Sequence, residues 1–301
     1  MADAPSVRIH TVLFHNDPDH LHRALSALAH AAVVARREGV AGRITLAYGD
    51  CSASPIFAEP AWERVRSQGG EGGLDEVSYT FFDANLGHGG GVNSLLQDLD
   101  ADYALVVNPD TVVSPRLLVE LLAGFASDGS VGAVEARQLP FEHPKEYDPV
   151  TGETPWVAGA CLMLPASVIR EVGGIDHESF FLYGDDVDWS WRIRLAGYRL
   201  IFRETAIVFH DKRVDQAGGW PIGSAEEYFS AEASLIMAYK WGRPDLVERY
   251  TAMIERAGSA LDRKALADFR TQEHEGKLPH PVDGASTVAT FIEDRYAHHR
   301  F

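Results

Sequence analysis

Two predicted strand ends carry residues that could bind a metal ion. Asn108-Pro109-Asp110 follows the apolar run YALVV directly, and His210 ends a second apolar run, AIVFH. A carboxylate at a strand end is well placed to hold a hard divalent cation, which could bridge two phosphates, and a histidine could complete the same site. Two simpler interpretations stay open. Asn, Pro and Asp all favour β-turns, and a lone histidine is often only a polar strand terminus.

The densest acidic motif is FFLYGDDVDWSWR, residues 180–192. If Asp185 begins a helix, the helix dipole favours carboxylates in its first turn. Two adjacent carboxylates, Asp185 and Asp186, are expected where one acts as a general base. Helix capping and an i,i+4 pair between Asp188 and Arg192 would explain two of the acids, but not the aromatic residues on both sides.

A glycine-rich segment, NLGHGGGVN at residues 85–93, is a third candidate. Glycines let the backbone approach a ligand closely, and the N-terminus of a following helix favours an anion. The spacing does not match G-x-G-x-x-G, and the segment follows the third predicted strand rather than the first. An ordinary flexible turn explains the segment equally well.

The elements that position these motifs alternate between strands and helices. We expect strands at 7–14, 44–48, 77–82, 103–107, 131–136, 156–164, 199–202 and 206–209. We expect helices at 20–37, 61–68, 92–99, 115–127, 167–172 and 185–196, then a helical end at 225–240, 244–257, 262–272 and 287–298. This order predicts an α/β fold with a mostly parallel, doubly wound sheet and helices on both faces. In such sheets ligands bind at the carboxyl ends of the strands, where 15–17, 49–52, 85–93 and 108–110 converge.

Composition narrows the class of protein. The chain has 301 residues and a formal net charge of −17, which argues against nucleic-acid binding and against charge-driven docking on an anionic membrane. We see no transmembrane segment and no secretory signal, and therefore expect a cytoplasmic protein. In that compartment Cys51 and Cys161 should be reduced thiols.

Taken in order, the motifs resemble those of family 2 glycosyltransferases with the GT-A fold, in the rhamnosyltransferase-like branch. The resemblance covers roughly residues 7–212, through ANLGHGGGVNSLL, YALVVNPDTVVSP, the long stretch from WVAGACLML to RLAGY, and AIVFH. It implies an inverting transferase that moves rhamnose or another hexose from a nucleotide-diphosphate donor, dTDP- or UDP-linked, to a hydroxyl of a glycan or small-molecule acceptor. It also implies a divalent cation, Mg or Mn.

The resemblance assigns roles by position. Asp186 matches the catalytic base, and Asp185 a catalytic residue that positions the acceptor. Metal ligands are Asp110 and His210, with Asn108 as a weaker or indirect ligand. The expected donor-binding residues are Asn16, Asp50, Asn85, Gly87, Asn93, Asn108, Gly159 and Ala160, and the expected acceptor-binding residues are Trp156, Asp185 and Trp189.

One departure from the family pattern concerns the nucleobase. At the end of the second strand, the position of the family's base-binding Asp falls on Gly49, and Asp50 lies one residue later. The choice between uridine and thymidine therefore stays open. Two other classes also stay open: a nicotinamide-dependent oxidoreductase on a doubly wound sheet, and a non-catalytic sugar-nucleotide-binding protein of the same fold.

The domain organisation predicted here has two parts. Residues 1–224 form the catalytic domain, with nucleotide-sugar binding in 1–112 and the acceptor half in 113–224, and residues 225–301 form a helical extension. The extension could pack on the catalytic domain or form a homodimer. The loop 216–223 could close over the donor or be a plain surface loop.

Overall fold

The fold is described from a computed structural model, which describes residues 4–126, 129–142, 144–211 and 223–297. Most of the 216–223 loop therefore lies outside the described residues. The strands are β1 (Val7–Leu13), β2 (Ile44–Asp50), β3 (Glu76–Phe81), β4 (Tyr103–Val107), β5 (Thr111–Val113), β6 (Val131–Leu139), β7 (Cys161–Pro165) and β8 (Arg199–His210). The helices are α1 (Pro18–Arg37), α2 (Ala61–Gly72), α3 (Gly87–Leu96), α4 (Leu117–Ala123), α5 (Ala166–Val172), α6 (Asp185–Leu195), α7 (Ser224–Lys240), α8 (Pro244–Ala257), α9 (Ala260–His274) and the short 3₁₀ helix η1 (Ala285–Thr287).

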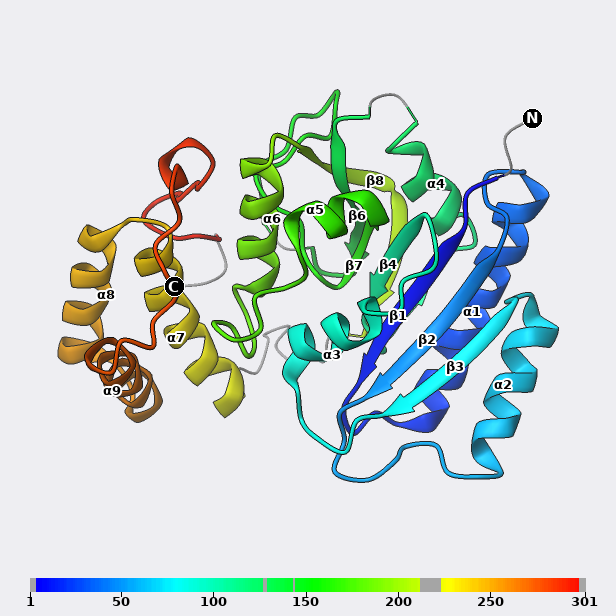
Figure 1. Ribbon diagram of the computed structural model, residues 1–301, viewed down its shortest axis with the longest axis horizontal. Helices are drawn as coiled ribbons and strands as arrows, with labels where there is room; N and C mark the ends of the chain where they lie inside the picture. Colours follow the sequence, from blue (N-terminus) through cyan, green and yellow to red (C-terminus); the bar gives the residue numbers. More distant parts are fainter. Residues whose placement is uncertain (1–3, 127–128, 143, 212–222, 298–301) are drawn as a thin grey trace.

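A single eight-stranded sheet with the order β3-β2-β1-β4-β7-β6-β8-β5 forms the centre of the molecule (Figure 1). The first four of these strands are parallel, β7 is antiparallel to both β4 and β6, β8 is parallel to β6, and β5 is antiparallel to β8. Because β1 to β4 are parallel, the polar segments that follow them meet at one edge. This α/β architecture confirms the predicted fold class.

Helix α1 shows how the sequence builds one layer. Pro18 occupies the first turn, and the Asp17 side chain accepts a hydrogen bond from Asp19 N, so the helix begins where its sequence can cap it. Its leucines and alanines are buried in the main hydrophobic cluster with the apolar side chains of β1 and β2. The helix thereby covers one face of the parallel half of the sheet (Figure 1).

The glycine-rich segment is not a turn, because Gly87–Leu96 is helical and forms α3. Its glycines permit close packing. A Cβ at Gly89 would lie 2.6 Å from Ile175 Cγ2, and a Cβ at Gly91 would lie 2.7 Å from Val12 Cγ1. Contacts under about 3 Å are not tolerated, so α3 is pressed between β1 and the segment 174–181.

Several other predicted elements need correction. The expected strand 156–164 is a strand only from Cys161, the two expected strands 199–202 and 206–209 are one strand, β8, and β5 was not expected. The expected helix 287–298 is absent from its described part, 287–297, which contains the end of η1, turns and an isolated β-bridge. Strand β8 stays continuous because it pairs with β6 through an irregularity near Ala136.

Helices α7 to α9 stack beside α6 on one side of the molecule (Figure 1). They share a hydrophobic cluster with α6. This cluster includes Trp191 of α6 and Trp241, which follows α7, and the two rings meet edge to face at 5.1 Å. Lys240, at the end of α7, makes ion pairs with Asp188 (2.6 Å) and Asp176 (2.7 Å). The helical extension is therefore bonded directly to the helix that carries the acidic motif.

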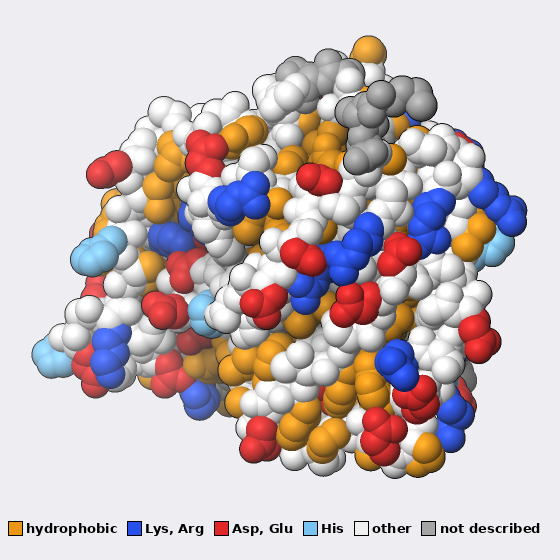
Figure 2. Space-filling model, turned by 45° about the vertical axis from the view of Figure 1, so that its right-hand side comes forward, with side chains coloured by type: hydrophobic (Ala, Val, Ile, Leu, Met, Phe, Trp, Pro, Cys, Tyr) orange, Lys and Arg blue, Asp and Glu red, His pale blue; other side chains and the backbone are white. Residues whose placement is uncertain are grey.

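One face of the molecule shows how its acidic side chains are distributed. On the face shown in Figure 2, acidic side chains lie among basic and hydrophobic ones and do not gather in one patch. Cys51 and Cys161 are both buried and unpaired with each other. Among the described residues, no helix is both long and apolar enough to cross a membrane.

Candidate functional site

Asp110 and His210 come together at the edge of the sheet. Strand β5 pairs antiparallel with the end of β8, and this brings His210 Nε2 to 3.3 Å from Asp110 Oδ1. The other ring nitrogen, Nδ1, lies 2.8 Å from Gln138 Oε1 on β6. An amide oxygen only accepts hydrogen bonds, so Nδ1 is the donor in this contact and Nε2 is the ring nitrogen that faces Asp110. The imidazole is buried, whereas the Asp110 carboxylate is 43% exposed.

The donor set fits a divalent cation. An imidazole nitrogen and a carboxylate oxygen point to one place, with an oriented outer-shell partner behind the histidine. Among the described residues, no group of three or more His, Cys, Asp and Glu side chains is placed to hold a metal ion. Two protein ligands would therefore leave the remaining positions to a substrate and to water.

Asp186 lies in the first turn of α6. Two adjacent residues, Gly159 and Ala160, link it to the loop 108–110, which carries the expected metal ligand Asp110. Gly159 N donates to Asp186 Oδ2 at 3.1 Å, and Val187 N donates to its Oδ1 at 2.9 Å. The next residue, Ala160, accepts a hydrogen bond from Asn108 N at 2.9 Å. The expected base and the expected metal loop therefore share one short backbone link.

Asp185 contacts His88, a histidine to which the sequence motifs assign no role. His88 Nδ1, in the first turn of α3, lies 3.0 Å from Asp185 Oδ2. Burial of the His88 ring lowers its pKa, but the bond to Asp185 and the charges of Asp185 and Asp186 outweigh burial and raise the pKa above its ordinary value. The only sequence signal for His88 was its place within the glycine-rich motif.

Asp50 is fully buried, which changes its expected role. One carboxylate oxygen accepts from Ser52 N (2.9 Å), and the other accepts from Ile56 N (2.8 Å) and from the Tyr79 hydroxyl (2.5 Å). With three donors and no exposed surface, Asp50 shapes the loop after β2, and direct contact with a nucleobase would need that loop to open.

Other expected donor residues lie at the same edge. Asn16 is half-buried after β1, where its Oδ1 accepts from Phe14 N at 2.8 Å, and Asn85 is exposed, with its Oδ1 accepting from Gly87 N at 3.1 Å. The Asn93 amide instead faces the segment 174–181: it donates to Ile175 O (2.7 Å) and accepts from Ile175 N (2.8 Å). Asn93 thereby fastens α3 to that segment.

The two tryptophans expected at the acceptor, Trp156 and Trp189, are core side chains. Trp189 is 1% exposed and donates its indole N–H to Gly173 O at 3.0 Å. Trp156 is 5% exposed, and Lys145 Nζ lies 4.0 Å from its ring centroid. Lys145 is itself paired with the buried Glu135, so a charged side chain lies over one face of the Trp156 ring.

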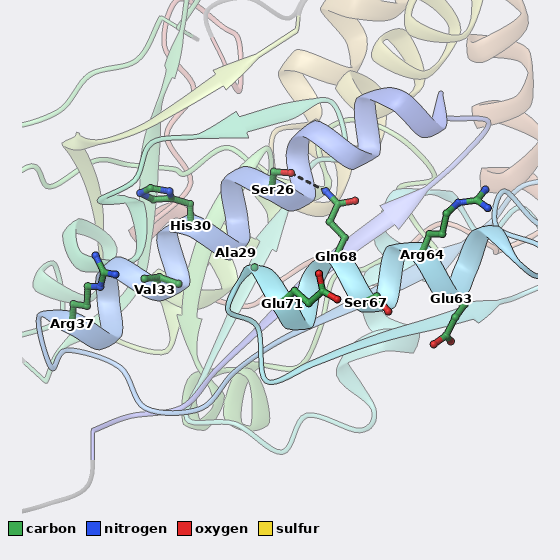
Figure 3. A pocket seen from close by; sticks show the side chains of 11 residues that line it. Ser26, Ala29, His30, Val33, Arg37, Glu63, Arg64, Ser67, Gln68 and Glu71 are labelled. Atoms are coloured by element: carbon green, nitrogen blue, oxygen red, sulfur yellow. Dashed lines mark hydrogen bonds between the residues drawn. The ribbon is translucent and has the colours of Figure 1, made fainter.

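Of two hollows on the surface, one contains the expected metal ligands and the other contains no residue of the motifs. A groove of about 780 Å³ lies between α1 and α2, and its side chains, including His30 and Glu71, belong to none of the motifs (Figure 3). A second hollow, of about 580 Å³, is lined by Asp110 and His210 and also by His20 and Arg23 of α1. Arg23, a cationic residue of α1, and His20 thus line the same hollow as the expected metal ligands, and no motif in the sequence pointed to them.

No known family profile matches the sequence, but curated relatives do. An N-acetylglucosaminyl-diphospho-decaprenol L-rhamnosyltransferase of Mycobacterium tuberculosis is 27% identical over 43% of this chain and 57% of its own length. A pre-mycofactocin glycosyltransferase of the same species is 34% identical over 34% of the chain and 21% of its own length. A low-salt glycan biosynthesis hexosyltransferase of Haloferax volcanii is 24% identical over 47% of this chain and 54% of its own length. The matched region thus spans little more than half the length of these relatives at most.

Solved structures show the same fold. A mannosyltransferase from Pyrobaculum calidifontis, in complex with GDP-Man and Mn2+, superposes with a TM-score of 0.57 at 14% identity, over 95% of this chain and 83% of that one. GalNAc-T7 with UDP, GalNAc and Mn2+ gives a TM-score of 0.62 at 13% identity, over 91% of this chain and 55% of that one. The chain therefore has the GT-A fold, and its sequence is similar to those of glycosyltransferases, a rhamnosyltransferase among them, as its motifs predicted.

Proposed function

We propose that the protein is an inverting, family 2 glycosyltransferase that uses a nucleotide-diphosphate sugar. The observation that carries this proposal is the Gly159-Ala160 link, because it places the expected base beside the loop that holds Asp110. The GT-A neighbours were solved with GDP-Man or UDP, and the curated relatives are named as sugar transferases. None of these proteins is an oxidoreductase, so the comparisons favour sugar transfer over the nicotinamide alternative.

In the proposed mechanism Asp186 removes the proton from an acceptor hydroxyl as that oxygen attacks the anomeric carbon of the donor. Gly159 N and Val187 N hold its two carboxylate oxygens in place. The bond between the anomeric carbon and the diphosphate breaks, and the configuration inverts in this single displacement. Asp110 and His210 would hold a divalent cation, Mg or Mn, whose charge would stabilise the departing diphosphate.

The donor and acceptor belong to the same proposal. Asn16, Asn85 and the backbone at Gly87 would face the nucleotide, and Asn108 would face the diphosphate. A dTDP- or UDP-linked hexose, including rhamnose, is the proposed donor, and a glycan or small-molecule hydroxyl is the proposed acceptor. Asp185 would bind the acceptor, whereas Trp156 and Trp189 support the site from the core.

The test is Asp186→Asn, compared with Asp283→Asn, the same chemical change at an exposed residue outside the site. Turnover of dTDP-rhamnose, UDP-glucose, UDP-galactofuranose and GDP-mannose is measured with Mg2+ or Mn2+, and again after EDTA. Loss of a general base costs about 10²- to 10⁴-fold in turnover. We expect that loss in D186N alone, with UDP binding by calorimetry retained. Near-normal turnover of D186N would refute the base assignment, and full turnover in EDTA would refute the metal assignment.

A further inference from the structure

His88 is held against the acidic pair by the backbone around it. Gly87 has φ +68°, a conformation that side chains other than glycine rarely adopt, and a Cβ there would lie 2.6 Å from Phe181 O. At the other end of the same helix, Asn93 makes two hydrogen bonds to the backbone of Ile175. Helix α3 is therefore fixed to the segment that leads into α6, and the contact between His88 and Asp185 follows from two rigid elements.

Gly159 lies against both His88 and Asp186, with room for one methyl group in contact with the two side chains. A Cβ built on Gly159 would lie 3.5 Å from His88 Cε1 and 3.6 Å from Asp186 Cβ, which are ordinary van der Waals distances. The backbone of Gly159 also donates to the Asp186 carboxylate. The imidazole and the expected base thus flank one position that a substrate group could enter.

The titratable groups near His88 lie on three elements. Asp185 and Asp186 belong to α6, and their charges favour the protonated ring. His177, in the segment packed on α3, lies against Gly90 and bonds to the Asn93 amide. Beyond Asp186, on β6, lies the buried Glu135, whose charge is met by its ion pair with Lys145.

We propose that His88 is a positioning residue of the acceptor site: its protonated ring holds Asp185 as a fixed hydrogen-bond acceptor for a second hydroxyl of the acceptor, next to the one that attacks, and offsets that carboxylate's charge. Asp186 is then the carboxylate that takes the proton of the attacking hydroxyl. His88 neither gives nor receives a proton in this step. This inference rests on the proposed function. It adds that His88 is the residue that assigns acceptor binding to Asp185 and proton removal to Asp186.

The experiment separates the hydrogen bond from the charge. His88→Asn keeps an N–H near the position of Nδ1 without a positive charge, and His88→Phe keeps a ring without the N–H. His30→Phe, on the exposed face of α1, is the matched control. Each variant is assayed for UDP release from UDP-sugars, with octyl β-glucoside as the acceptor hydroxyl, across pH 5 to 9, and for UDP affinity by calorimetry.

We expect H88F to lower kcat/KM for the acceptor about 100-fold, the size of effect that misplaced reacting groups produce, with UDP affinity and H30F unchanged. H88N should recover part of that loss and lack the fall in activity that wild type shows as the ring loses its proton at higher pH. Wild-type kinetics in H88F, or equal loss of UDP affinity, would overturn the inference. An inactive wild type across all donors would instead refute the proposed function.

A second readout needs no turnover. NMR titration of the His88 ring should give a pKa above its ordinary value in wild type, and Asp185→Asn should lower that pKa. A pKa for His88 that does not respond to D185N would overturn the proposed contact even if the enzyme is active.

Discussion

Replacement of Lys240 by methionine tests how the helical extension is held to α6. Lys240 is 5% exposed, and its Nζ lies 2.6 Å from Asp188 Oδ1 and 2.7 Å from Asp176 Oδ2. Asp188 is 0% exposed and keeps two other partners, Arg192 Nε at 2.8 Å and the Trp241 indole N–H at 3.0 Å. Methionine keeps most of the apolar stem of the side chain and removes the ammonium group, with its charge and its N–H donors.

Breaking a buried ion pair costs about 3–5 kcal/mol, because the remaining charge is left in the interior. The two remaining partners of Asp188 place the expected loss for K240M near the lower end, about 3 kcal/mol in the free energy of unfolding. Lys264→Met is the matched control, since Lys264 pairs with Asp268 at the surface with 61% of its side chain exposed. A surface i,i+4 pair contributes about 0.3–0.5 kcal/mol.

The assay is urea unfolding followed by circular dichroism, with the free energy taken from the midpoint and slope. If a stranded charge on Asp188 causes the loss, the double variant D188N/K240M should be more stable than K240M alone. A loss below about 1 kcal/mol in K240M, or a loss equal to that of K264M, would refute the reasoning.

The same pair predicts a pH dependence. Burial raises the pKa of Asp176, but the hydrogen bond and charge of Lys240 outweigh burial and hold it below its ordinary value. A carboxyl with a lowered folded-state pKa contributes stability above its unfolded pKa, about 3.9, and that stability is lost as the pH falls through the folded pKa. The stability difference between wild type and K240M should therefore shrink between pH 6 and pH 3. A difference that stays constant over that range would contradict the assignment.

Two further predictions concern the site. Gly159→Ala should fold normally, because its Cβ meets His88 and Asp186 at ordinary contact distances, yet it should lower turnover of the donor screen by filling the space between them. Unchanged kinetics would show that no substrate group enters there. Gln138→Leu should weaken Mn2+ binding about 10- to 100-fold, measured by calorimetry in the presence of UDP, because it removes the partner of His210 Nδ1. Unchanged affinity would argue against His210 as a ligand.

The sequence predicts the order of strands and helices correctly where the hydrophobic pattern and the residues that end an element indicate the same boundaries. Strands β1 to β4 and helices α1, α6 and α8 lie close to their expected bounds, because apolar alternation and caps act over short distances. The glycine-rich segment was misread as a turn. Glycine has a low helix propensity, and only close packing against Val12 and Ile175 explains why α3 is helical.

The candidate site also combines features that the sequence shows with features that depend on packing. Residue type alone marked Asp110, Asp186 and His210 as groups able to do chemistry. Residue type could not show that Trp189 is buried or that Asp50 turns inward to three donors, because burial depends on what packs from elsewhere in the chain.

The fold class, the polar edge of the sheet and the acidic motifs can be predicted from the amino-acid sequence, since they follow from local pattern and residue chemistry. Which side chains meet across long separations is visible only in the folded chain. It pairs His88 with Asp185, Gln138 with His210, and Lys240 with Asp188. Those contacts join elements that lie far apart along the chain, and their geometry depends on how helices and strands pack, which no local sequence pattern encodes.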